Sequence, residues 1–186
     1  FFELEAHGQS QIAGEALERI AALYAIEQEL SELDAEARQA LRQTQAQPLL
    51  EEALKLRRQV LGQEHTDVAV SLNHLAAVVN LNGDSARSES LHREALAMRR
   101  KLLGTEHPDV AESLDNLGSL LVDRGSYAEA ETLLREALAQ RRRLLGEEHK
   151  DVAESLTSLG RLLSDTGKFN EAAVLYRQVL EMRRKL

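Results

Sequence analysis

Cysteine and tryptophan are absent from this sequence of 186 residues, and only two prolines, three tyrosines and three phenylalanines occur. The missing thiols exclude disulfide bonds and thiolate metal ligands, and they are compatible with a reducing compartment. The scarcity of aromatic residues, proline and glycine disfavours a β-sandwich and long irregular loops. No apolar run approaches the ~20 residues of a membrane span, and the first residues lack the basic and apolar regions of a signal peptide. We therefore expect a cytoplasmic, helical protein with a core of leucine and alanine.

Acidic residues outnumber basic residues by 31 to 23, so the formal net charge is −8. This balance disfavours nonspecific binding to nucleic acid or to an anionic membrane. Four basic clusters nevertheless recur, at residues 57–58, 99–101, 141–143 and 183–185. They fit either a phosphate-binding stripe or positive charge at the C-terminal ends of helices. Because no aromatic residues are interleaved and the chain is acidic, we favour the second interpretation.

A period of 42 residues organises most of the chain. Gly62, Gly104 and Gly146 keep this step, and so do a second set of glycines and a set of histidines. A fixed period of this size is typical of a solenoid. In the second copy, apolar residues three and four positions apart predict one helix over residues 109–123 and another over residues 127–145. A glycine follows each helix and is expected to end it.

Each copy carries the tetrapeptide Glu-His-x-Asp, in which the histidine is His65, His107 or His149. Histidine titrates near neutral pH and binds metals, so one interpretation is a metal or acid–base site. However, a single copy offers one histidine and flexible carboxylates rather than three converging ligands. Successive copies lie a whole repeat apart. We therefore predict that the motif ends one helix and starts the next, and that it is neither a metal site nor a catalytic site.

The stretch LDNLGSLLVDRGSYAEAETLLREAL, residues 114–138, resembles a tetratricopeptide repeat. The joint LG-x-E-H-P-D-V-A and the 42-residue period are similar to the kinesin-light-chain variety, which in bacteria often accompanies nucleotide-binding signalling domains or peptidase modules. The resemblance implies an all-α fold, a right-handed solenoid of antiparallel helix pairs. The third copy keeps the family signature, whereas the first copy has Ala76, Ser85, Ser88 and His92 at signature positions. We expect the first copy to pack less tightly than the others.

We divide the chain into an N-terminal helical segment, residues 1–47, and a repeat array. The array consists of a half repeat and three full repeats, at residues 48–62, 63–104, 105–146 and 147–186. Residues 1–54 resemble the helical region of IS66-type transposases, but no catalytic carboxylate of that family maps onto them. We expect this segment to cover the first repeat and Pro48 to kink or restart its last helix. The sequence begins with phenylalanine rather than methionine, so we also expect a fragment or a processed product.

In tetratricopeptide repeats the first helix of each pair lines a concave groove, so the resemblance implies a partner site there. The outward positions that we predict to bind a protein or peptide are Asn73, Asn80, Asp115, Asn116, Ser119 and Arg161. No Ser-His-Asp order, Gly-rich phosphate loop or His-Glu-x-x-His motif occurs. We therefore predict a non-enzymatic interaction scaffold without catalytic residues, metal or cofactor, which binds neither membrane nor nucleic acid.

Two alternatives to the scaffold stay open. The last helix carries Leu175, Val179 and Met182, which we expect to meet a following repeat. If a second copy covers them instead, the chain is a structural subunit that self-assembles head-to-tail into a homopolymer or filament. The weaker alternative, based on the first 54 residues alone, is a regulatory remnant of a transposase.

Overall fold

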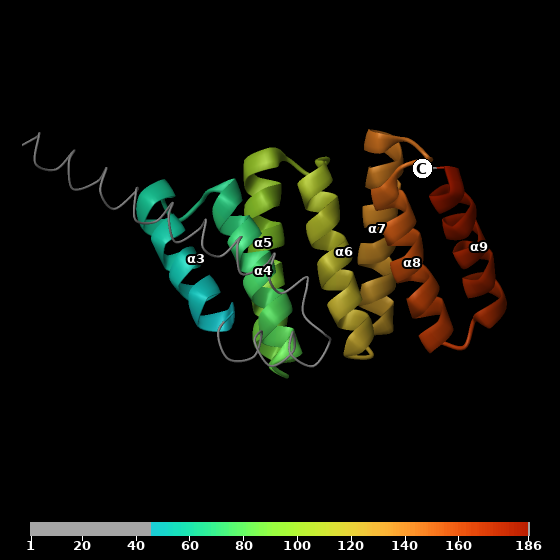
Figure 1. Ribbon diagram of the computed structural model, residues 1–186, viewed down its shortest axis with the longest axis horizontal. Coiled ribbons are helices and arrows are strands. Elements are labelled where there is room, and N and C mark those ends of the chain that lie inside the picture. Colours follow the sequence, from blue (N-terminus) through green and yellow to red (C-terminus); the bar gives the residue numbers. More distant parts are fainter. Residues whose placement is uncertain (1–45, 186) are drawn as a thin grey trace, which may run out of the picture. The chain divides into compact units, whose positions relative to one another are not determined.

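The computed structural model describes residues 46–185, and this part of the chain consists of seven α-helices without any strand (Figure 1). The helices are α3 (Gln47–Leu61), α4 (Thr66–Leu81), α5 (Ser85–Leu103), α6 (Pro108–Asp123), α7 (Tyr127–Leu145), α8 (Lys150–Asp165) and α9 (Phe169–Lys185). This result confirms the all-α class and the two helices predicted for the second copy. The N-terminal segment, with its transposase resemblance and its expected covering role, lies outside the described residues except for its last two positions.

The helices follow the 42-residue period. We call α4, α6 and α8 the A helices, and α3, α5, α7 and α9 the B helices. Each A helix begins directly after a histidine of the repeated motif, and each B helix from α5 onward begins just after a glycine turn. Gly104 and Gly146 follow the B helices α5 and α7 with φ of 82° and 85°, the left-handed region that favours glycine. Pro48 lies in the first turn of α3, where its missing N–H costs nothing. The helix that it was expected to kink or restart lies outside the described residues.

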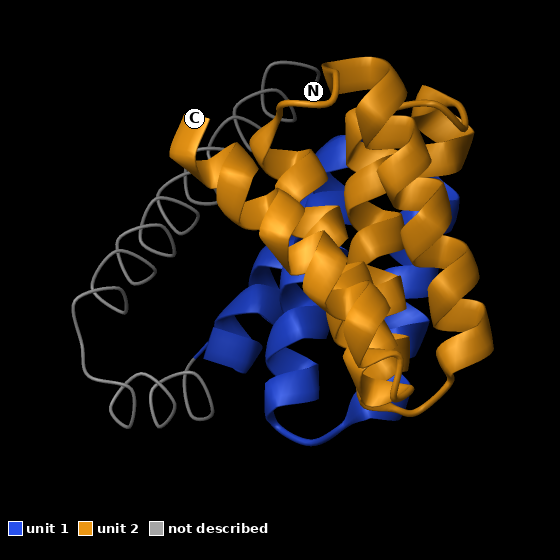
Figure 2. Cartoon of the chain, turned by 90° about the vertical axis from the view of Figure 1, so that its right-hand side faces the viewer, with its two compact units in different colours: residues 1–98 blue, residues 99–186 orange. Residues whose placement is uncertain are grey.

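The described residues belong to two compact units, unit 1 and unit 2, which divide the chain between Met98 and Arg99 (Figure 2). In unit 1 the described core comes from α3, α4 and α5, and its buried residues are Leu54, Val68, Ala69, Leu72, Leu75, Val79, Ala95 and Met98. In unit 2 the helices α6 to α9 pack in chain order, and the largest buried side chains include Leu114, Leu117, Leu121, Leu134, Leu156 and Leu162. Truncating one of these leucines to alanine should cost about 2–5 kcal/mol of unfolding free energy.

Glycine allows the A and B helices of a pair to approach closely in unit 2. A Cβ atom added to Gly118 of α6 would lie 2.8 Å from Cγ and Cδ2 of Leu134 in α7. A Cβ atom added to Gly160 of α8 would lie 2.8 Å from the Tyr176 ring in α9. The glycine and the large residue opposite it are therefore complementary in shape, so a larger residue at either glycine would force the helices apart.

In the first copy, the A helix α4 and the B helix α5 are joined by hydrogen bonds at the corresponding positions. Ala76 stands at the glycine position, and its backbone carbonyl accepts a hydrogen bond of 2.7 Å from the buried hydroxyl of Ser88. His92 stands where the second copy has Leu134, and its Nδ1 donates to Oδ1 of Asn73 at 2.9 Å. The substitutions are thus matched in pairs, and each of these buried side chains has a hydrogen-bond partner. Looser packing of this copy stays a prediction.

The last helix differs in one respect from the sequence prediction. Val179 of α9 is buried, and so is Ala137, its counterpart one period earlier. Leu175 and Met182 are half-buried, whereas Val174 and Leu180 are exposed. The sequence pattern indicated Leu175, Val179 and Met182 as the apolar residues of α9 that a following repeat would cover, and none of these three is among the exposed apolar residues.

No helix between residues 46 and 185 has the length and apolar character of a membrane span.

Candidate functional site

The repeated histidine is a helix cap. Nδ1 of His107 accepts a hydrogen bond of 3.2 Å from the backbone N–H of Asp109, and the histidines before α4 and α8 do the same with Asp67 and Asp151. Each cap satisfies one of the N–H groups that the first turn of a helix leaves open. This confirms that the motif joins two helices. Within the described residues no group of three or more histidine, aspartate or glutamate side chains could hold a metal ion.

The first arginine of a basic cluster holds two helices together, which differs from the simple role of charge at a helix end. Nη1 of Arg141 donates to the Asp151 carbonyl and to the Ser155 hydroxyl, both at 2.8 Å. Arg99 makes the same pair of bonds to Asp109 and Ser113, at 2.7 and 2.9 Å. We call this arrangement the arginine clasp: the guanidinium bonds a carbonyl 10 residues later and a hydroxyl 14 residues later.

The clasp ties a B helix to the A helix of the next pair. Arg99 and Arg141 are only 2% and 4% exposed, so their charges are almost fully removed from water. In unit 1 the half-buried Arg57 donates to the Ser71 hydroxyl at the same spacing. A buried guanidinium is tolerated only where its donors are used. These arginines are therefore engaged in hydrogen bonds within the protein, and they do not support a phosphate-binding stripe.

The second arginine of a cluster connects neighbouring B helices. Arg58 lies 2.5 Å from Glu94 in unit 1, and Arg100 lies 2.8 Å from Glu136 in unit 2, in each case 36 residues later. Arg142 has a glutamine at this spacing and pairs instead with Glu147 at 2.9 Å. We call the 36-residue ion pairs rungs. They are half-exposed and should each contribute little to stability.

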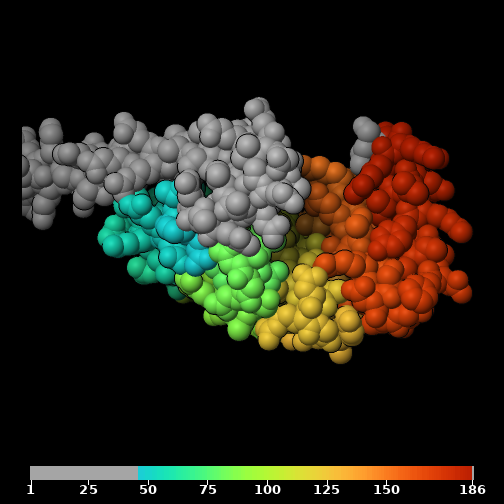
Figure 3. Space-filling view, turned by 60° about the horizontal axis from the view of Figure 1, so that its bottom comes forward, coloured from blue at the N-terminus to red at the C-terminus, as the bar shows by residue number. Residues whose placement is uncertain are grey.

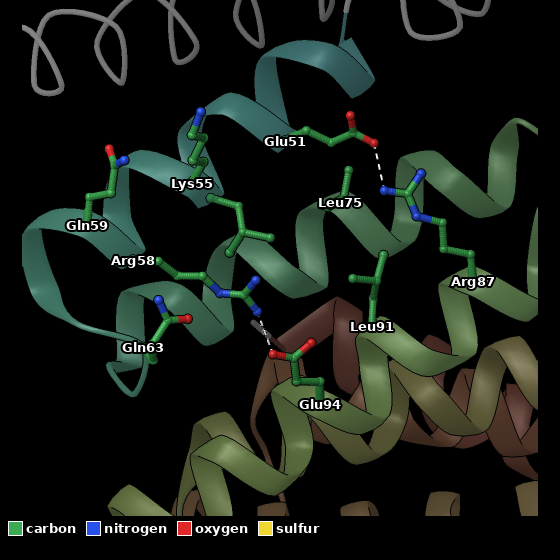
Figure 4. A pocket seen from close by; sticks show the side chains of 10 residues that line it. Glu51, Lys55, Arg58, Gln59, Gln63, Leu75, Arg87, Leu91 and Glu94 are labelled. Carbon is green, nitrogen blue, oxygen red and sulfur yellow. Dashed lines mark hydrogen bonds and ion pairs between the residues drawn. The ribbon is translucent and has the colours of Figure 1, made fainter.

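Unit 1 has a hollow between its two B helices (Figure 4). Its apolar lining is Leu54, Leu75 and Leu91, and its charged lining includes the rung Arg58–Glu94 and a 2.7 Å ion pair between Arg87 and Glu51. Hydrogen bonds from Gln47 and from Arg87 hold the pKa of Glu51 below its usual value. These four charges are thus paired with one another, and the hollow offers few groups to a ligand.

The facing A helices of unit 2 share a polar seam. Asp115 of α6 accepts hydrogen bonds from the hydroxyls of Ser155 and Ser158 in α8, at 2.9 and 3.0 Å. Nη1 of Arg141 lies 3.6 Å from the same carboxylate, so the clasp and the seam meet there. Asp115 is only 8% exposed. The sequence predicts an outward position for Asp115, and this is wrong, because the structure places it at the bottom of the seam.

The seam continues toward the C-terminal end of α6. The Ser119 hydroxyl donates to the Ser158 hydroxyl at 3.3 Å. Arg161 of α8 donates to the Ser119 carbonyl at 2.9 Å and to the Asp123 carboxylate at 2.7 Å. Three predicted site residues, Asp115, Ser119 and Arg161, therefore lie along one seam between two helices. Asn116 is half-buried on the same helix as Asp115, and its side chain hydrogen-bonds to no other described residue.

Unit 1 holds the other two predicted site residues on α4. Asn73 is 5% exposed and bonded to His92, so it belongs to the interior rather than to the outward face. Burial lowers the pKa of His92 to about 4. Asn80 is half-buried, and its Oδ1 accepts a 2.7 Å hydrogen bond from Ser85. A role of these six residues in partner binding stays a prediction.

Comparisons with known proteins agree with the fold. A family model for the tetratricopeptide repeat matches residues 35–101, 67–139 and 109–185. The solved structure of BtubC (BKLC) from P. vanneervenii is 24% identical, with a TM-score of 0.71, over 97% of this chain and 71% of that one. A Podosopora anserina protein of the kinesin light chain kind, with nearly identical TPR-like repeats, is 26% identical, with a TM-score of 0.62, over 98% of this chain and 93% of that one. A variant of the latter protein has the same identity and a TM-score of 0.64. The comparison with curated proteins finds no match.

Proposed function

Because the chain belongs to the tetratricopeptide repeat family and is an all-α solenoid, we propose that it is a non-enzymatic scaffold that binds a protein or peptide partner on its A-helix faces. Proteins of this family are generally interaction scaffolds. The finer claim, that the partner contacts the A helices, is supported chiefly by the polar seam of unit 2. There, short polar side chains follow one another along two adjacent helices, as the lining of a peptide site requires.

We divide the predicted residues into two groups by their burial. Asp115 and Asn73 are buried and hold neighbouring helices together, so we assign them a positioning role. Asn116, Ser119 and Arg161 are half-buried and lie at the surface of the A helices. The amide of Asn116 offers two donors and an acceptor to a backbone that passes over it. Extended peptides are commonly held by hydrogen bonds to their main chain.

A pull-down from lysate of the source cells tests the proposal. The A-helix variant carries Asn80→Ala, Asn116→Ala and Arg161→Ala and leaves the buried Asn73 and Asp115 intact. A matched control carries Lys55→Ala, Gln59→Ala and Thr132→Ala, which are exposed on the B helices. We expect the A-helix variant to lose partners that the wild type and the control both retain. Equal recovery of every partner by all three proteins would remove the A-helix faces from consideration.

The runner-up function is a structural subunit that self-assembles head-to-tail. The exposed apolar residues Val174 and Leu180 on the last described helix favour it. A contact of this kind joins two different surfaces and propagates unless the ring closes. Multi-angle light scattering and negative-stain microscopy test it, and a monomer whose mass does not change with concentration would exclude it.

A further inference from the structure

The turn between α4 and α5 contains an asparagine followed by a glycine, a pair that occurs once in the sequence. Asn82 is the C-cap of α4, and Gly83 follows it with φ of 90°. Both residues are exposed, and a Cβ atom added to Gly83 would meet no atom within 4 Å. Figure 3 shows this turn, in green, at the surface. The second and third copies have Arg124 and Thr166 before the corresponding glycine.

The side-chain amide of an asparagine reacts with the backbone nitrogen of the residue that follows it. The Gly83 nitrogen attacks Cγ of Asn82, the bond between Cγ and Nδ2 breaks, and ammonia leaves with the proton of the Gly83 N–H. One water molecule then opens the succinimide ring at either of its two carbonyl carbons, which gives aspartate or isoaspartate. The reaction consumes one water and releases one ammonia. Glycine favours the attack because no side chain crowds the attacking nitrogen.

The folded turn holds the reacting groups apart. Asn82 has ψ of 2°, so the Gly83 nitrogen lies on the side of the backbone nitrogen of Asn82 and away from Cβ. The Gly83 N–H donates to the Asn80 carbonyl at 2.9 Å, and Nδ2 of Asn82 donates to Oε1 of Gln47 in α3 at 2.7 Å. The attack therefore requires that the turn opens. Exposed helix ends open locally at a small cost in free energy.

The Asn82 amide is one end of a series of hydrogen bonds that joins the helices of unit 1. Gln47 donates to Glu51 at 3.1 Å, and Arg87 of α5 donates to the same carboxylate at 2.7 Å across the hollow of Figure 4. A carboxylate in place of the amide has no N–H to donate to Gln47. It also adds a negative charge at the C-terminal end of α4, where the helix dipole disfavours it.

We propose that Asn82–Gly83 is a modification site, at which spontaneous deamidation converts Asn82 to aspartate or isoaspartate and releases Gln47, at the start of α3, from the α4–α5 turn. Opening of the turn controls the rate of this reaction in the folded chain. The proposal is independent of partner binding on the A-helix faces, since the reaction needs no second molecule except water.

Incubation of the full chain at mildly alkaline pH, followed by trypsin digestion and mass spectrometry, tests the reaction. The tryptic peptide of residues 59–87 contains Asn73, Asn80 and Asn82, so two asparagines serve as internal controls. We expect conversion at Asn82 alone, with the aspartate and isoaspartate products separated by chromatography. The rate should be at least about tenfold lower than in the chain unfolded by urea, because hydrogen bonds of the turn must open first.

Variants test the bond between Asn82 and Gln47. Gln47→Ala frees the Asn82 amide, and the rate of conversion should rise about fivefold for the one lost hydrogen bond. Asn82→Asp represents the product and should lower the midpoint of thermal unfolding by about 2–4 °C. The same change should lower the midpoint by less in the Gln47→Ala background, where the bond is already absent. The control Asn82→Arg, with the residue type of the second copy, should give no product at position 82.

Three results would overturn the proposal. The first is a folded chain that keeps the Asn82 amide under conditions in which the unfolded chain loses it. The second is conversion of Asn73 or Asn80 as fast as that of Asn82. The third is a conversion rate in Gln47→Ala, or an unfolding midpoint in Asn82→Asp, that equals the wild-type value, because the bond to Gln47 would then not hold the turn.

Discussion

Acid should destabilise unit 1 through one buried histidine. His92 of α5 lies beneath the surface with its Nδ1 hydrogen-bonded to Asn73 at 2.9 Å. Burial lowers its pKa from 6.5 to about 4, because the charged imidazolium is disfavoured there. At a pH between these two pKa values, the His92 side chain is protonated in the unfolded chain and neutral in the folded chain. Stability from this group is therefore complete above pH 6.5 and decreases as the pH falls toward 4.

The size of the effect follows from the shift. A difference of one pKa unit corresponds to about 1.36 kcal/mol, so the fall from 6.5 to about 4 corresponds to a loss on the order of 3 kcal/mol. Other groups titrate in this range as well, and a single pH profile would not isolate His92. The variant His92→Leu removes the titrating group and restores the leucine that the second copy has at this position.

Urea unfolding of both proteins at about pH 7, 6, 5 and 4, followed by far-UV circular dichroism, gives the comparison. The variant also loses the bond to Asn73, which adds an offset that does not depend on pH. Between about pH 7 and pH 4, we expect the unfolding free energy of the wild type to fall by about 3 kcal/mol more than that of His92→Leu. Two curves that stay parallel over the range would refute the assignment of a buried, neutral histidine.

Further predictions concern the joints of unit 2. Arg141→Ala should cost about 3–5 kcal/mol, because it leaves the Asp151 carbonyl without its buried donor and the buried Asp115 carboxylate without its positive partner. Arg141→Lys should recover only part of this loss, as measured by denaturant unfolding. Gly118→Leu should cost about 1–3 kcal/mol or more through overpacking; adding Leu134→Ala should cost less than the two single changes together, and strict additivity in a double-mutant cycle would argue against contact. His107→Ala should cost about 1 kcal/mol through the lost cap and His107→Asn much less; equal thermal midpoints for both variants would show that the cap is not stabilising.

The helix boundaries could be predicted from the sequence because their signals are local. The prediction of residues 109–123 and 127–145 agrees with α6 and α7 to within one residue. Periodic leucines, a polar residue before the first turn and a glycine after the last turn act over a few positions. These signals recur every 42 residues, and this repetition removes most of the ambiguity about where each helix begins and ends.

The outward positions could not be read in the same way. An A helix such as α6 contacts its own B helix α7 and also the next A helix α8. In the sequence, a hydrophobic stripe identifies only the face that makes apolar contacts. A polar side chain that contacts the next A helix therefore cannot be distinguished from a polar side chain exposed to solvent. The outward placement of Asp115 is wrong for this reason, since its partners are serine hydroxyls of α8. The outward placement of Asn73 is wrong because Asn73 bonds to His92 of its own B helix, a polar residue where the second copy has a leucine.

A signal for the arginine clasp is nevertheless present in the sequence. Ser71, Ser113 and Ser155 keep the 42-residue step, and each follows an arginine of a basic cluster by 14 residues. A serine at a fixed distance from one basic residue suggests nothing by itself. The repetition of both residues in the same register as the fold period distinguishes them from surface residues.

Site-specific photocrosslinking tests most directly the claim that partners bind on the A-helix faces. A photoreactive phenylalanine analogue would replace Asn116 on the A helix α6 or, as the control, Thr132 on the exposed side of the B helix α7. We expect a crosslinked partner from position 116 that an excess of unlabelled chain competes away, and no such product from position 132. A partner captured equally well from both positions, or from position 132 alone, would contradict the claim.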